Sequence, residues 1–141
     1  MLDFKFSQRS LNNLEGVHSD LIVVVTHALL ISEIDFVVIE GLRTPERQQQ
    51  LFDAGATRTT RSRHMTGHAV DLAVWWKGAI RWDWPFYDRL SVFVKEAAKH
   101  HNIDITWGGD WQSFRDGPHY ELSRKTYKET TDEHIDQSTH C

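Results

Sequence analysis

The segment SRHMTGHAVDL, residues 62–72, holds two potential metal ligands, His64 and Asp71, on either side of a glycine. Gly67 lets the chain turn between them. Asp71 lies in an otherwise apolar run of strand-forming character, residues 69–74. Burying a polar group with no compensation costs on the order of 2–7 kcal/mol, and more for a charge. The segment therefore predicts a strand whose acid is compensated by a cation or by a full set of hydrogen bonds.

Side chains alternate between the two faces of a strand, so Asp71 shares its face with Ala69 and Ala73. The larger apolar residues face the other way: Val70, Leu72 and Val74. The small alanines leave room beside Asp71 for something bulky, such as a metal ion with its ligands. An aspartate satisfied by backbone amides is the alternative interpretation.

A second segment, DGPHYEL at residues 116–122, offers another histidine between carboxylates. Pro118 ends any helix, and His119 begins a short strand in which His119 and Glu121 share one face. Two histidines and one carboxylate would be three zinc ligands with a fourth position open for water. Asp116 and Glu121 are both candidates for the carboxylate that takes the proton of that water, and the sequence does not separate them.

His68 is a less suitable ligand. His64 and His68 would share a face of a helix, but the helical zinc motif requires a glutamate directly after the first histidine, where this chain has Met65. Gly67 and the following strand also argue against a helix. We interpret His68 as a residue beside the ligands or at the surface.

The spacing S-x-H-x-x-G-x-A-x-D, followed later by D-x-x-H, resembles the signature of the M15 zinc peptidases. These are the D,D-carboxypeptidases of the VanX and VanY type and the phage L-alanyl-D-glutamate endolysins. Further matches lie at residues 40–48 (EGLRTPERQ) and 107–111 (WGGDW). The similarity covers about residues 3–122, and the chain most resembles the single-domain phage endolysins.

The resemblance implies that His64, Asp71 and His119 bind zinc and that Asp116 is the catalytic base. Arg43 matches an arginine that binds substrate or stabilises the tetrahedral intermediate. Ser62 is expected to orient His64 or to contact the substrate. The implied reaction is hydrolysis of peptidoglycan stem peptides, at the L-Ala–D-Glu bond. Two alternatives remain: a D-alanyl-D-alanine peptidase on the same scaffold, and a zinc-stabilised binding module without catalysis.

Strands are predicted at residues 36–40, 69–75, 103–107 and 118–122, and helices at 7–15, 45–54 and 85–101. Another helix, capped by Ser19 or Asp20, is predicted through Ile31, although its β-branched run would also suit a strand. The pattern predicts an α+β fold. A small, mainly antiparallel sheet would carry the zinc site on one face and helices on the other, as in Hedgehog and the D,D-peptidases, which the chain resembles.

Several charged or ionisable residues allow two interpretations. Arg43 could be a surface residue that pairs with Glu40 or Glu46. The arginines of residues 56–63 could belong to a flexible loop or contact an anionic peptide at the rim of a cleft. His27 is interpreted as a core or boundary residue. His100 and His101 are interpreted as helix-end residues that complement the helix dipole.

The chain has 141 residues, and we expect one peptidase domain at residues 1–127 followed by a disordered tail at 128–141. Sixteen basic and 20 acidic residues give a formal charge of −4, with no basic stripe for nucleic acid. The single cysteine excludes an internal disulfide.

The N-terminus lacks the apolar stretch of a secretory signal, and no run is long enough to span a membrane. We therefore expect a monomer that stays in the host cytoplasm until a holin releases it to the periplasm and cell wall.

Overall fold

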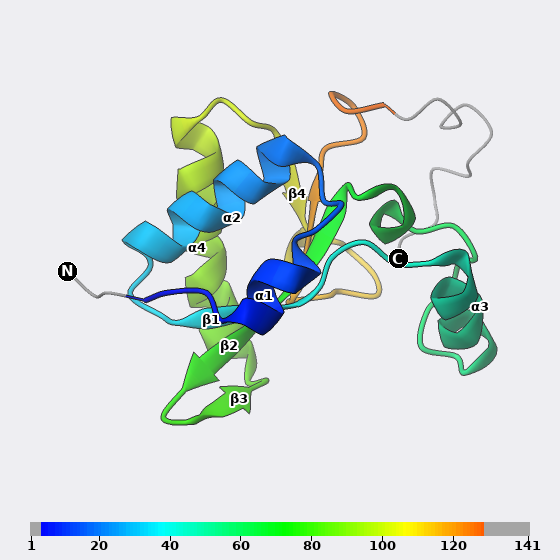
Figure 1. The fold of residues 1–141 in the computed structure, drawn as a ribbon, viewed down its shortest axis with the longest axis horizontal. Coiled ribbons are helices and arrows are strands. Elements are labelled where there is room, and N and C mark those ends of the chain that lie inside the picture. Colours follow the sequence, from blue (N-terminus) through cyan, green and yellow to red (C-terminus); the bar gives the residue numbers. More distant parts are fainter. Residues whose placement is uncertain (1–3, 129–141) are drawn as a thin grey trace.

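The computed structural model describes residues 4–128, and a five-stranded sheet forms its centre (Figure 1). The strand order is β1 (Phe36–Glu40), β2 (Ala69–Trp76), β5 (His119–Leu122) and β4 (Ile105–Trp107), and β3 (Ala79–Arg81) pairs with β2. Every pair is antiparallel. The predicted α+β fold with a small antiparallel sheet is confirmed.

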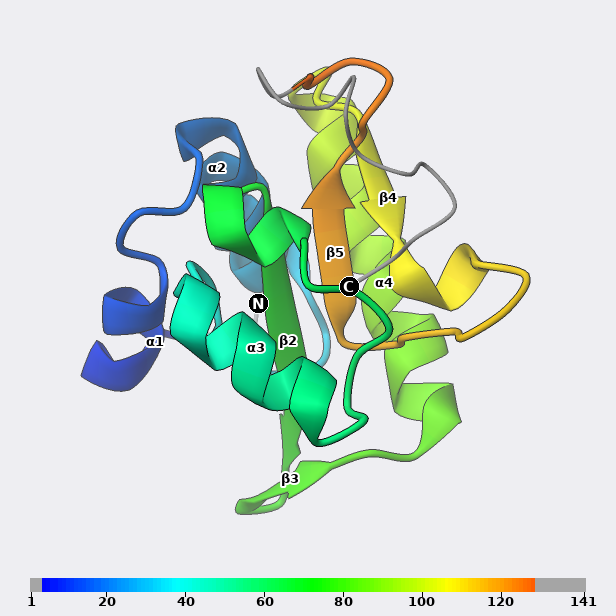
Figure 2. The ribbon, with the colours of Figure 1, turned by 90° about the vertical axis from the view of Figure 1, so that its right-hand side faces the viewer.

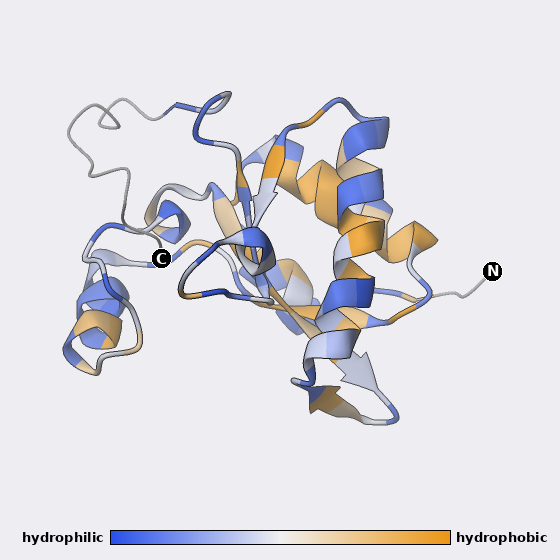
Figure 3. Ribbon diagram, turned by 180° about the vertical axis from the view of Figure 1, so that it is seen from behind, coloured by the Kyte–Doolittle hydropathy of each residue, from blue (hydrophilic) through white to orange (hydrophobic). Residues whose placement is uncertain are grey.

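Helices α2 (Ser19–Ile31) and α4 (Trp84–His100) pack against each other on one side of the sheet. Helix α1 (Gln8–Asn13) lies along the free edge of β1, where the Ser10 hydroxyl accepts a hydrogen bond from the Val38 amide at 3.1 Å. Hydrophobic residues are frequent along α2 and α4, whereas α3 (Pro45–Asp53), on the other side of the sheet, is mainly hydrophilic (Figure 3). The side chains at the centre of this core are fully buried: Leu21, Val24, Leu72, Leu90, Val94 and Leu122. Helix, rather than strand, is thus correct for the β-branched run in α2.

The start of α2 differs from the prediction. His18, not Ser19 or Asp20, precedes the helix with non-helical backbone angles, and its Nδ1 accepts a hydrogen bond from the Asp20 amide at 3.0 Å. The first amide groups of a helix have no hydrogen-bond partner within the helix, and the His18 ring accepts from one of them. The histidine ring takes the place that a hydroxyl or carboxylate usually fills.

The opposite side of the sheet carries α3 and a single 3-10 turn, η1 (Arg63–Thr66), both of which lie in front of β2 in Figure 2. Thr44 caps α3, and Pro45 occupies its first position, where an amide donor is not needed. Gly67 ends η1 with φ 78°, and a Cβ there would lie 2.3 Å from the Gly16 carbonyl oxygen. Only glycine fits both constraints. This turn brings His64 back over β2.

The alternation predicted for β2 is present. Val70, Leu72 and Val74 belong to the hydrophobic core, whereas Asp71 points to the side of α3 and η1. After β2, Lys77 and Gly78 have positive φ angles of 51° and 79° and form the turn of the hairpin to β3. The sheet therefore separates a packed hydrophobic side from a polar side.

The predicted domain bounds, 1–127, stay a prediction, and the predicted tail lies outside the described residues except for residue 128. Across residues 4–128 no helix combines the length and the apolar character needed to cross a membrane.

Candidate metal centre and active site

Three side chains that are distant in sequence meet on the polar side of the sheet. His64 comes from η1, Asp71 from β2 and His119 from the first position of β5. Asp71 and His119 are direct cross-strand partners, so the register of the β2–β5 pair fixes their approach. One potential ligand atom from each of the three residues lies within 4.8 Å of the other two.

The distances suit a tetrahedral metal ion. Asp71 Oδ1 lies 3.2 Å from His64 Nε2 and 3.3 Å from His119 Nδ1. Zinc bonds of about 2.0–2.2 Å to nitrogen and oxygen place two ligand atoms of a tetrahedron about 3.4 Å apart. The two edges measured at Asp71 are close to that spacing, so a metal ion fits with small shifts of the side chains.

The second nitrogen of each histidine fixes the proton arrangement. His64 Nδ1 lies 2.9 Å from the Gly41 carbonyl oxygen, which can only accept, so Nδ1 carries the proton. His119 Nε2 lies 2.8 Å from Glu121 Oε1 in the same way. In the neutral rings, His64 Nε2 and His119 Nδ1 therefore turn lone pairs toward Asp71. Three electron-pair donors that converge in this way form a ligand set for a cation.

The carboxylate of Asp71 is held in its charged form. Burial raises the pKa of Asp71, but when His64 and His119 are protonated, their charges and hydrogen bonds outweigh burial and hold the pKa well below its usual range. Arg43 Nη2 lies 3.8 Å from Asp71 Oδ2 and adds a positive charge on the other side. The Asp71 side chain is 18% exposed, so the site is open to solvent at this edge.

Arg43 is buried and oriented by its neighbours. Its Nε donates to Glu40 Oε2 at 3.0 Å and its Nη1 donates to Gln48 Oε1 at 2.9 Å. The predicted pairing with Glu40 is present, but at a buried position instead of the surface. The guanidinium of Arg43 is thus held facing Asp71 at the edge of the site. Because its orientation is already fixed, little side-chain entropy is lost when it binds a further group.

Ser62 acts on the backbone of η1. Its Oγ accepts a hydrogen bond from the His64 amide at 3.1 Å, and the Ser62 side chain is buried. The Arg43 amide donates to the His64 carbonyl oxygen at 2.9 Å. His64 is therefore held at both its backbone groups, which supports an orienting role for Ser62; its contact with substrate stays a prediction.

Asp116 lies at the turn that leads into β5. Its carbonyl oxygen accepts from the His119 amide at 3.2 Å, and its amide donates to the Gly108 carbonyl at 3.0 Å. A Cβ placed on Gly108 would lie 3.0 Å from Asp116 Cβ and 3.1 Å from His119 Cβ. The Cβ atoms of Asp116 and His119 therefore both lie against the backbone of Gly108. The tight approach of Gly108 sets Asp116 next to the candidate ligand His119.

Glu121, the other candidate base, is engaged elsewhere. It is 3% exposed, binds His119 Nε2, and lies 3.3 Å from Arg124 Nε and 3.8 Å from Arg63 Nε. Burial raises its pKa, but His119 and the two arginines outweigh this and lower it. A carboxylate with a lowered pKa that holds a candidate ligand ring is suited to positioning, which leaves Asp116 as the remaining candidate base.

Arg63 and His68 both lie outside the candidate metal centre. Arg63 is 1% exposed and donates to the carbonyl oxygens of Leu122 and Tyr127, so it is a structural residue and not part of a rim. His68 Nδ1 lies 2.8 Å from Thr66 Oγ1, outside the His64–Asp71–His119 group.

A cleft of about 270 Å³ opens beside Asp116, between residues 55–58 and residues 111–116. The Arg58 guanidinium lies 3.8 Å from the centre of the Phe114 ring, and Arg115 also lines the cleft. The Trp111 ring, at the other end of this lining, lies 5.2 Å from the His119 ring. The cleft is therefore cationic and adjoins the candidate metal centre.

Replacing Glu121 by glutamine should lower the affinity for the metal. The neutral amide removes the negative charge that supports His119, and losses of this kind typically cost about 10–100-fold in affinity. We expect Glu121→Gln to fold and to release zinc at a correspondingly lower concentration of a competing chelator. Glu15→Gln, an exposed change of the same kind, is the control; equal affinity of both variants would contradict the positioning role.

Comparison with known proteins yields a consistent set of relatives. The family model described as phage L-alanyl-D-glutamate peptidase matches residues 2–136. The L-alanyl-D-glutamate peptidase of Escherichia phage T5 is 32% identical over 130 residues, which cover 89% of this chain and 94% of that protein. The peptidoglycan L-alanyl-D-glutamate endopeptidase CwlK of Bacillus subtilis (strain 168) is 35% identical over 104 residues, 63% of this chain and 61% of that protein.

Among solved structures, the L-Ala D-Glu endopeptidase ChiX of Serratia marcescens superposes with a TM-score of 0.84. It is 43% identical in sequence, and the match covers 89% of this chain and 95% of that one. The fold and the sequence therefore lead to the same group of proteins.

Proposed function

The chain belongs to the phage L-alanyl-D-glutamate peptidase family, and from this premise we propose that it is a zinc peptidase that cleaves the L-Ala–D-Glu bond of peptidoglycan stem peptides. One observation carries the zinc part of the proposal. His64 and His119 have their outer nitrogens fixed by Gly41 and Glu121, and both turn their other nitrogens to Asp71. Two imidazoles and one carboxylate are a ligand set used by catalytic zinc sites.

His64, Asp71 and His119 would hold the ion. When bound, zinc lowers the pKa of a coordinated water to about 7 and polarises a peptide carbonyl. The protein fixes this ligand set through the cross-strand register of Asp71 and His119 and through the capped turn that carries His64.

Asp116 would take the proton of the attacking water and return it to the amine of the leaving group. Its place on the turn before His119 supports this role. Arg43, oriented by Glu40 and Gln48 toward the Asp71 edge, would bind a substrate carboxylate or stabilise the developing oxyanion with its fixed fork of donors.

The cleft beside Asp116 supports an anionic substrate. A D-glutamyl residue carries a carboxylate next to the scissile bond, and Arg58 and Arg115 line the cleft on that side. As further parts of the proposal, the enzyme acts as a monomer and depends on a holin to reach the cell wall from the host cytoplasm.

The deciding experiment is digestion of purified sacculi followed by mass spectrometry of the soluble products. The proposal requires peptides with a new amino terminus at D-Glu, their loss with EDTA and their return with zinc. A new amino terminus at the terminal D-Ala would instead identify a D-alanyl-D-alanine peptidase. No release with zinc present would identify a binding module.

Arg43→Lys should reduce turnover while zinc binding persists. Lysine keeps the charge but cannot donate to Glu40 and Gln48 and face the site at once. Loss of one donor to an oxyanion typically costs about 100–1000-fold in kcat. The measurement is the release of soluble peptide at saturating sacculi, with zinc content determined in parallel. Arg47→Lys, on the exposed side of α3, serves as control, and unchanged kcat in Arg43→Lys would argue against the role.

A further inference from the structure

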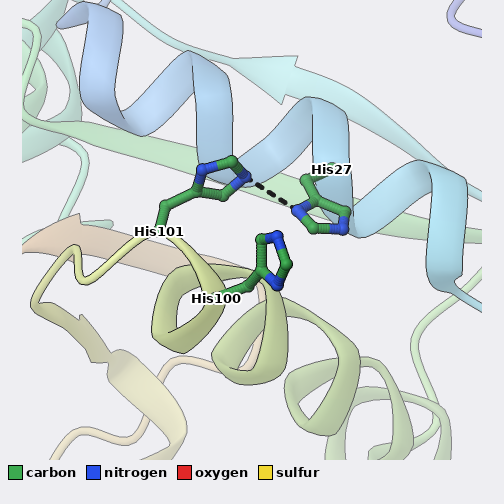
Figure 4. Close-up of side chains that lie close together, drawn as sticks. All are labelled: His27, His100 and His101. Atoms are coloured by element: carbon green, nitrogen blue, oxygen red, sulfur yellow. Dashed lines mark hydrogen bonds between the residues drawn. The ribbon is translucent and has the colours of Figure 1, made fainter.

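A second group of three metal-binding side chains lies away from the proposed active site, at the C-terminal end of α4. It consists of His27 from α2, His100 at the last position of α4, and His101, which caps that helix (Figure 4). One ring nitrogen of each lies within 4.8 Å of the other two. Within residues 4–128 this group and His64–Asp71–His119 are the two such groups.

The end of α4 explains how two neighbouring histidines face one partner. Adjacent residues in a continuous helix point in different directions. Here the helix ends at His100, and Asn102 adopts the left-handed conformation with φ 55°, which reverses the chain. His101 itself has left the regular helix, with φ −98° and ψ 4°, and its ring meets His27 of α2 (Figure 4).

The three rings have the spacing of a ligand cluster. Their centres lie 4.8, 4.9 and 5.1 Å apart, and the ring planes are inclined by 78–90°. The proposed zinc ligands His64 and His119 have a similar ring separation of 5.1 Å and an inclination of 70°. In both groups one ligand atom of each residue lies within 4.8 Å of the other two.

The nitrogens of His27 and His101 are already in contact. His27 Nδ1 and His101 Nε2 are 2.8 Å apart, so one proton lies between them and one of the nitrogens accepts it. Two nitrogens of a tetrahedral zinc site lie about 3.4 Å apart when each bond is about 2.0–2.1 Å. A metal ion could replace the shared proton after the rings separate by about half an ångström, and both His100 and His101 are exposed enough to move.

Two electrostatic features near the cluster favour a cation, against the positive charge of the neighbouring Lys99. The C-terminal end of α4 carries the negative end of the helix dipole, and Glu96 lies one turn before His100 on the same side of the helix. Burial and the two neighbouring histidines lower the pKa of His27, although Glu96 opposes them. A lower pKa favours the neutral ring, which is the form of histidine that binds a metal.

From this geometry we infer that His27, His100 and His101 form a second binding site for a divalent transition metal of the zinc and nickel class. Imidazole nitrogen is a preferred ligand for these ions, whereas calcium and magnesium require oxygen. The site joins the end of α4 to α2, so an ion bound there would clamp the two helices that cover the sheet. The inference does not depend on the proposed catalytic function.

The test is the zinc content of the full chain, measured after equilibration with Zn²⁺ buffered by a chelator. His27→Gln, His100→Gln and His101→Gln should each bind one equivalent less than the wild type. His18→Asn removes a histidine from the start of α2, the helix that carries His27, and keeps a good N-cap. This control should bind the same amount of zinc as the wild type. Every variant keeps residues 129–141, so zinc bound there cancels in the comparison.

A second measurement separates this site from the catalytic one. Zinc should raise the thermal midpoint of His119→Gln, whose proposed active site is incomplete, and this rise should disappear when His101→Gln is added. The exposed positions of His100 and His101 make misfolding of those variants a minor concern. Equal zinc content in the wild type and the three cluster variants would overturn the inference and leave the proposed active site untouched.

Discussion

His119→Ala is expected to lose both the bound zinc and the lytic activity. His119 supplies one of three proposed ligands, and it is completely buried between Asp71 and Glu121. A site reduced to one histidine and one carboxylate cannot compete with chelators for zinc. A metal ion contributes several kcal/mol to stabilisation of the transition state, so activity should fall by about 1000-fold or more.

The same change also affects stability, and the experiment has to separate the two effects. Removing a buried ring leaves a cavity that typically costs about 2–5 kcal/mol, and Glu121 loses its partner. His119→Gln fills more of the space and can still meet Glu121, so it tests the metal more cleanly. Both variants should be checked for thermal unfolding, zinc content and release of peptide from sacculi. A folded His119→Gln with full zinc and full activity would refute the ligand assignment.

Much of the metal centre could be predicted because strand alternation is a local property. Asp71 stood out as the charged residue in an apolar run, and its alanine neighbours indicated which face was open. The structure brings His64 and His119 to that face. Their meeting depends on the β2–β5 register, which the sequence alone does not specify. The family resemblance implied the set of three residues without that register.

Ring orientation is what the sequence could not supply. Asp116 and Glu121 flank His119 at similar sequence distances, and only the direction of its two nitrogens separates their roles. The pairing of His119 and Glu121 on one face was visible as an i, i+2 spacing. It could have suggested that the carboxylate orients the ring, since ligand histidines usually bond a carboxylate or carbonyl with the second nitrogen.

Element ends were less predictable than the elements themselves. The strand predicted at residues 103–107 begins only at Ile105, because the Ile103 amide still donates to the Ala98 carbonyl at the end of α4. The His27–His100–His101 cluster left no signal at all. His27 lies more than 70 residues from the adjacent pair His100 and His101, and their contact depends on how α2 packs on α4.

Asp116→Ala is expected to keep zinc and lose lysis, which separates the base from the ligands. The backbone of Asp116, not its side chain, accepts from the His119 amide and donates to Gly108, so these bonds survive the change. General base catalysis contributes about 100–10,000-fold, and the loss of turnover should fall in that range. Asp116→Asn, which preserves the size of the side chain, should behave in the same way.

The control for Asp116 is Asp110→Ala, an exposed acid on the neighbouring η2 turn (Gly108–Asp110) that pairs with Lys95 at 2.7 Å. It should keep both zinc and activity. Zinc content near the wild-type value together with lost peptide release would assign Asp116 to the chemical step, because a ligand could not be removed without losing the ion. Full activity in Asp116→Ala would exclude it as the base, and Glu121 would then be tested despite its buried contacts with His119 and Arg124.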